Sequence, residues 1–178
     1  MQSRRPATST LSLAMGKLAV AAAAVAATAL VTARAEDSQA AVAAPAGTVV
    51  RTVHAVGAQI YECKTDGHAG LAWSFREPVA TLISDGTTVG RHFAGPSWEM
   101  VDGSLVVGTV VATASGTAVD DIPWLRLDVS QHHGSGILGD VTVIQRLSTV
   151  GGKKSGPCPT VGALFVEPYS AIYVFLRP

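Results

Sequence analysis

Short apolar segments rich in Val, Ile, Leu and Thr recur from Val49 onward, and turn residues separate them. Alternation is clearest within residues 124–129, where Leu125, Leu127 and Val129 fall on one face of an extended chain and charged residues fall on the other. Leu105–Val111 is mostly apolar on both faces, as expected of a strand inside a packed sheet. The apolar segments span residues 49–56, 58–63, 71–75, 80–84, 87–93, 104–114, 124–130, 137–147 and 170–176. This pattern is typical of β-strands.

Two Asp-Gly pairs mark hairpin turns. Asp85-Gly86 separates ATLIS from TTVGRHF, and Asp102-Gly103 separates PSWEMV from SLVVGTVV. Such pairs supply the positive φ angles that a tight hairpin needs. Helix is expected at most as one turn near Glu77–Ala80, where Pro78 suits the first helical position. The sequence therefore predicts an all-β fold, either an antiparallel β-sandwich or a flattened barrel of about eight short strands with little helix.

The first 35 residues have the pattern of a secretory signal peptide. Basic residues precede an apolar run over residues 18–31, and Ala33 and Ala35 then form an A-x-A cleavage site. The apolar run is shorter than the roughly 20 residues that a spanning helix needs. We therefore expect cleavage near Ala35, secretion to the extracellular side, and no stable membrane anchor after cleavage.

The rest of the chain is expected to be one domain behind a short leader. Residues 36–47, EDSQAAVAAPAG, show no apolar periodicity and predict a flexible leader, and residues 48–178 predict a single β-rich domain. Removing residues 1–35 takes away four of the 13 basic residues and none of the 13 acidic ones, which leaves a net charge of −4. A mildly acidic chain lacks the basic surface that binds phosphate backbones, so nucleic-acid partners are excluded.

Cys63 and Cys158 are the two cysteines of the chain. An even cysteine count in an exported protein predicts a disulfide, whereas a metal or redox site needs closer spacing. The bridge would close a loop of about 95 residues and restrict the unfolded chain by about 4 to 5 kcal/mol. The alternative is two separate buried thiols.

Five strings of the sequence carry a resemblance to a known family: AQIYEC, VGRHFAGPSWEMVDGS, IPWLRL, VTVIQRLSTVGG and PYSAIYVF. In this order and spacing they resemble the secreted bacterial and fungal family called domain of unknown function 3455, over roughly residues 48–177. The resemblance implies a signal peptide and a β-rich domain, with no biochemistry to carry over. Some fungal members carry a malate dehydrogenase label, but the sequence has no G-x-G-x-x-G after a strand and no βαβ alternation.

Most motifs of catalysis and metal binding are missing or have a structural interpretation. No G-x-S-x-G nucleophile elbow occurs. His132-His133 lies in SQHHGSGILG, which predicts a solvated loop pair rather than a metal site, so neither a metal nor a cofactor is expected. Asp120-Asp121 is expected to cap a turn. Trp73, Trp98 and Trp124 are core residues or, alternatively, stacking platforms for sugars.

The segment Gly90–Ser104 is where we expect any functional site. His92, Glu99 and Asp102 are candidate acid–base residues, and the same three together with Trp98 are candidate ligand-binding residues.

A chain reversal at Gly95-Pro96 is the basis of this hypothesis. The reversal predicts three cross-strand pairs, Ala94 with Ser97, Phe93 with Trp98, and His92 with Glu99. Opposite residues lie about 5 Å apart at Cβ, so His92 and Glu99 would reach hydrogen-bonding distance. The alternative is a satisfied His92 in a bent strand, with Phe93 and Trp98 in the core.

These observations predict a secreted, non-catalytic ligand-binding or envelope-associated module, with a carbohydrate or small molecule as partner. The alternatives are a small secreted hydrolase or lyase that uses a His/carboxylate acid–base pair, or a purely structural domain. A deep pocket joining His92 to a carboxylate would favour the enzyme. A flat face with exposed Trp73 or Trp124 would favour carbohydrate or partner binding.

Overall fold

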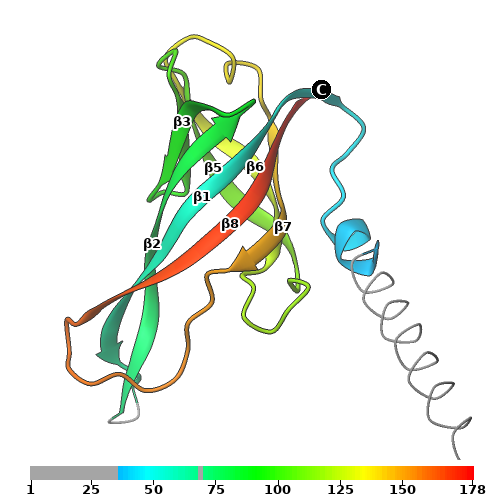
Figure 1. Cartoon of the computed structure of the whole chain (residues 1–178). Coiled ribbons are helices and arrows are strands. Elements are labelled where there is room, and N and C mark those ends of the chain that lie inside the picture. Colours follow the sequence, from blue (N-terminus) through cyan, green and yellow to red (C-terminus); the bar gives the residue numbers. More distant parts are fainter. Residues whose placement is uncertain (1–35, 68–69) are drawn as a thin grey trace, which may run out of the picture. The chain divides into compact units, whose positions relative to one another are not determined.

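The computed structural model describes residues 36–67 and 70–178, so the predicted signal peptide lies outside the described residues. Each of eight strands pairs antiparallel with the next, and β1 also pairs with β8, which closes the sheet into a ring (Figure 1). The strands are β1 (Thr48–Thr65), β2 (Leu71–Ser84), β3 (Thr87–Phe93), β4 (Ser97–Met100), β5 (Leu105–Ala114), β6 (Trp124–His133), β7 (Val143–Gly151) and β8 (Leu164–Arg177). The predicted all-β, antiparallel fold is confirmed. No helix among the described residues has the length and apolar character to cross a membrane.

Three strands, β1, β2 and β8, are much longer than the sequence predicted. β1 has 18 residues and joins two predicted segments across Gly57, where a Cβ atom would lie 2.1 Å from the Val79 carbonyl oxygen. β2 has 14 residues and continues through Pro78, so the helical turn expected there is wrong. Pro78 pairs with Gln59 of β1 but lies outside the part of β2 that pairs with β3, which begins at Ala80, so its place in the strand is an edge position, where proline is tolerated.

Both Asp-Gly pairs lie in tight connections, as predicted. Asp85 and Gly86 have φ angles of 50° and 74° between β2 and β3, and Gly103 has φ of 83° between β4 and β5. In an up-and-down ring the connections alternate between two ends. The β3–β4 and β5–β6 connections therefore lie at the end opposite to these two turns.

The core fills the inside of the ring. Trp98, Tyr173 and Phe175 are almost fully buried there, and the indole ring of Trp98 contacts both of the others edge to face. Trp124 is also buried, and half-buried Trp73 packs against Phe165 with ring centroids 5.4 Å apart. Trp98 and Trp124 are therefore core residues, as predicted, whereas Trp73 is a partly buried residue outside the core.

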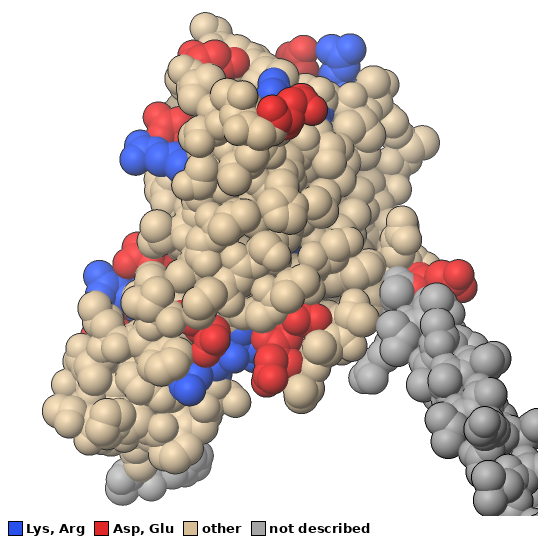
Figure 2. Space-filling view, viewed as in Figure 1, with Lys and Arg blue, Asp and Glu red and all other residues tan. Residues whose placement is uncertain are grey.

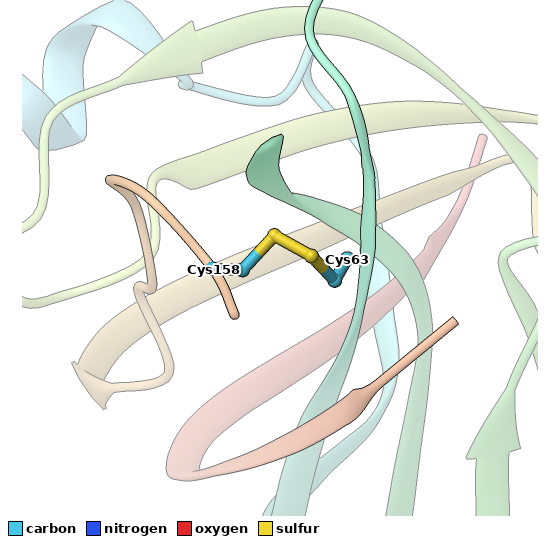
Figure 3. The surroundings of a disulfide bond; sticks show 2 residues. All are labelled: Cys63 and Cys158. Atoms are coloured by element: carbon cyan, nitrogen blue, oxygen red, sulfur yellow. A yellow bond between two sulfur atoms is a disulfide. The ribbon is translucent and has the colours of Figure 1, made fainter. Parts of the chain in front are cut away.

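The predicted disulfide is confirmed. Cys63 near the end of β1 bonds to Cys158 in the β7–β8 connection, with Cα atoms 5.7 Å apart (Figure 3). The connection also pairs with β2, because the Cys158 N–H donates to the Leu71 carbonyl at 3.1 Å. The bridge thus fastens a long loop to the ends of β1 and β2.

Residues 36–47, expected as a flexible leader, are helical over residues 36–41 and pack against the strands. The Ser38 hydroxyl donates to the Ser115 carbonyl at 3.0 Å, and Val42 is fully buried. Its carbonyl accepts from the Gln145 amide at 2.8 Å, and the Arg126 guanidinium donates to the Ala43 carbonyl at the same distance. The leader is therefore part of the folded unit.

The expected His132-His133 loop is instead the end of β6, so the loop prediction is wrong. The Nε2 atom of His132 lies 2.8 Å from the Val141 carbonyl oxygen. Among the described residues, no three His, Cys, Asp or Glu side chains gather into a group able to hold a metal ion. Figure 2 shows charged side chains scattered over a surface that is mostly uncharged in this view.

Candidate functional site

A cavity of about 500 Å³ lies at the end of the ring that carries the β3–β4 and β5–β6 connections. Every one of the eight strands contributes at least one lining residue. Its walls are mainly apolar and aromatic, and a few polar side chains reach it. The lining residues are Gln59, Tyr61, Phe75, Arg76, Pro78, His92, Ala94, Gly95, Pro96, Trp98, Val110, Ile122, Pro123, Leu125, Leu127, Arg146 and Tyr173.

His92 is the buried histidine of this site. Its ring is stacked on the Trp98 indole, with centroids 4.5 Å apart, and Nδ1 lies 2.9 Å from the Ser97 carbonyl oxygen. A carbonyl only accepts, so Nδ1 carries the proton and Nε2 keeps its lone pair. Burial lowers the pKa of His92 to about 3, against a smaller opposing effect of the Ser97 hydrogen bond. His92 is therefore neutral at physiological pH.

The predicted reversal at Gly95-Pro96 is confirmed, but the predicted pairing is wrong by one residue. His92 lies opposite Trp98, and Glu99 lies opposite Arg91. The connection contains the three residues 94–96, whereas the prediction assumed two. A slip of one residue moves a side chain to the other face of a sheet. Glu99 consequently lies on the outside and pairs with Arg91, whose Nε donates to its carboxylate at 2.6 Å.

Asp102 lies in the β4–β5 turn and is not among the residues that line the cavity. Its carboxylate accepts from the backbone N–H of Ser104 at 2.9 Å and from that of Ile137 at 2.8 Å. Hydrogen bonds from Ser104 and Ile137 hold the pKa of Asp102 below its ordinary value. Of the predicted site residues, the structure brings His92 and Trp98 together at the cavity and leaves Glu99 and Asp102 elsewhere.

The sequence analysis did not identify five residues of the cavity that carry polar groups: Gln59, Tyr61, Arg76, Arg146 and Tyr173. Gln59 is 2% exposed and Tyr173 is fully buried, yet the Gln59 Nε2 and the Tyr173 hydroxyl have no partner in hydrogen-bond geometry within the described part of the chain. Gln59 lies on the same buried face of β1 as Tyr61 and Cys63. A polar residue at a core position of an alternating strand is the signal that was available.

Arg146 provides the positive charge of the site. Its Nε donates to the Pro123 carbonyl at 3.0 Å, which fixes the guanidinium at the cavity wall. Burial raises the pKa of Tyr169 and of Tyr173, and the charge of Arg146 acts against that rise in both. The same charge adds to the lowering of the pKa of His92. The positive field of Arg146 therefore reaches the buried polar groups of the site.

A second arginine, Arg76, enters the lining at the register shift in β2. Opposite residues in β1 and β2 pair as Ile60 with Glu77 and Tyr61 with Phe75, which leaves Arg76 as the extra residue of a bulge. Bulges are common beside binding sites because they redirect a side chain. The charge of Arg76 is balanced by Glu77, with 3.1 Å between Nε and Oε1.

A model of the family described as "Protein of unknown function (DUF3455)" matches residues 43–88 and 83–177. The chain belongs to this family. Each of the five strings that carry the resemblance to DUF3455 contributes to the cavity wall, through Gln59, His92, Leu125, Arg146 and Tyr173 among others. Neither a curated protein nor a solved structure matches the chain significantly.

Proposed function

We propose that this protein binds a small and largely apolar molecule in the cavity at the end of the ring. The main support is that all eight strands, and all five sequence segments that resemble DUF3455, contribute residues to one cavity. A volume of about 500 Å³ lies within the range of about 300–1,000 Å³ that is usual for small-molecule sites. Apolar walls with a few placed polar groups are likewise usual for such sites.

The same geometry argues against the hydrolase or lyase alternative. That alternative needs a carboxylate beside His92, but Glu99 lies on the outer face and Asp102 is bound in a turn. Among residues 36–67 and 70–178, the cavity lining includes neither Asp nor Glu. With a pKa of about 3, His92 is not an imidazolium at neutral pH and so lacks the proton that a general acid would transfer, and its single N–H faces the Ser97 carbonyl. Binding without catalysis is the function that these residues support.

Export of the protein is part of this proposal. The Cys63–Cys158 disulfide supports it, because disulfides form and persist mainly in oxidising compartments. The ligand would accordingly be a molecule met outside the cytoplasm.

The test is a fluorescence titration with N-phenylnaphthylamine, an uncharged flat apolar probe. Two neighbouring valines of β5 give a matched pair: Val110 lines the cavity, whereas Val111 does not, and both are exposed. We expect Val110→Phe to weaken probe binding at least about tenfold, because the ring fills the cavity, and Val111→Phe to leave it within twofold. Absence of saturable binding to the unaltered protein, or equal effects of the two substitutions, would refute the proposal.

A further inference from the structure

We propose that the ligand of this cavity carries a carboxylate, which the guanidinium of Arg146 binds. The inference rests on the proposed function and adds the chemical class of the ligand. It follows from the hydrogen-bonding character of the cavity, its charge and the way in which Arg146 is held.

The polar atoms without partners at this cavity are mainly donors. The amide nitrogen of Gln59, the indole Nε1 of Trp98 and the hydroxyl of Tyr173 are buried and have no hydrogen-bond partner among the described residues. A buried donor without a partner costs stability, so a ligand that supplies an acceptor gains that energy on binding. A carboxylate matches these donors, because both of its oxygens accept hydrogen bonds and neither donates one.

The charge of the cavity is positive, and it is centred on Arg146. Of the two lining arginines, Arg76 is paired with Glu77, whereas Arg146 has no ion pair within the described part of the chain. Glu167 lies opposite Gln59 in the register of β1 and β8 but is not a lining residue. The lining itself therefore presents one uncompensated cation, next to Tyr173.

The position of Arg146 suits bidentate binding. Tyr173 on β8 and Leu125 on β6 are its register partners, and both line the cavity. The hydrogen bond from Nε to the Pro123 carbonyl uses one of the five N–H donors of the guanidinium, and the other four are on its two terminal nitrogens. A guanidinium held in this way presents a fork that matches the two oxygens of a carboxylate.

Competition against N-phenylnaphthylamine tests the inference with two compounds of the same shape, naphthoate and naphthamide. Naphthoate carries the carboxylate and naphthamide is its neutral counterpart. The protein is produced from the full chain and purified with its disulfide intact. We expect naphthoate to displace the probe at a concentration at least about tenfold lower than naphthamide, because a charge-assisted hydrogen bond is stronger than a neutral one.

Three variants assign this preference to its source. Arg146→Gln should bring the ratio of the two displacement constants to within twofold of one, whereas Arg146→Lys, which keeps the charge but not the fork, should keep a reduced preference. Arg91→Gln removes the same charge from the outer face, where Arg91 pairs with Glu99, and should keep the full ratio. Circular dichroism establishes that each variant is folded. Should Arg146→Gln unfold, Arg146→Lys and the two compounds on the unaltered protein still decide.

Equal displacement by the two compounds in the unaltered protein would overturn the inference while leaving the proposed function intact. A preference for naphthoate that persists in Arg146→Gln would overturn it as well, because the carboxylate would then bind elsewhere. Failure of the probe itself to bind would instead remove the proposed function. The two failures are therefore distinguishable in one set of titrations.

Discussion

Protonation of His92 is expected to destabilise the folded protein as the pH falls. In the unfolded chain His92 has its ordinary pKa of 6.5, and in the folded protein burial lowers that pKa to about 3. Between pH 6.5 and about pH 3, His92 is therefore protonated in the unfolded state but not in the folded state. The free energy of unfolding consequently decreases as the pH falls from 6.5 towards 3. From these two pKa values, the loss between about pH 7.5 and about pH 5 is about 2 kcal/mol.

The assay is urea unfolding at those two pH values, for the unaltered protein and for His92→Asn. An asparagine amide reaches as far from the backbone as Nδ1, so it can still donate to the Ser97 carbonyl. All other titrating groups are common to both proteins. The acid-induced loss of unfolding free energy should be about 2 kcal/mol larger with His92 present, a midpoint difference of roughly 1 M urea. Equal pH dependence, or an NMR titration of the His92 ring near its ordinary pKa, would refute the reasoning.

Three further outcomes are expected. Replacing both Cys63 and Cys158 by Ser should lower the urea-unfolding free energy by about 4 to 5 kcal/mol, because the bridge closes a loop of 95 residues; a loss below about 1 kcal/mol would contradict this. Glu99→Gln should leave the N-phenylnaphthylamine affinity within twofold, since Glu99 lies outside the ring, and a tenfold loss would place it in the site. Gly152→Ala should cost more unfolding free energy than Gly156→Ala. Both glycines have positive φ, but a Cβ at residue 152 meets side-chain atoms from 2.8 Å, whereas one at residue 156 meets nothing within 4 Å.

The strand content and the disulfide could be predicted from the sequence because each depends on a local or compositional rule. Alternation in Trp124–Val129 reports which side chains share a face, and Asp85-Gly86 reports a tight turn. Strand length could not be predicted in the same way. Gly57 interrupts the apolar pattern as a turn would, but in the structure it allows β1 and β2 to approach closely.

The site was predictable only in part, because register and ring closure are not local properties. The reversal at Gly95-Pro96 was predicted correctly. The connection has one residue more than predicted, however, so Trp98 and not Glu99 lies opposite His92. The contribution of Arg146 depends on pairing with β6 and β8, which no single segment reveals. Arg146 follows apolar Ile144 by two residues, which places both on one face of β7, and this spacing was the available sign that a charge faces inward.

Pairing of β1 with β8 makes the ring complete only when the last strand is in place. Thr48 lies opposite Arg177, so this contact joins residues near the two ends of the domain. Contacts of such large sequence separation carry a high entropic cost of loop closure and fold slowly. Tyr173 reaches the cavity from this closing strand. The wall of the cavity is therefore complete only when β8 has paired with β1, and the hairpin of β3 and β4 supplies His92 and Trp98 to a cavity that a distant strand closes.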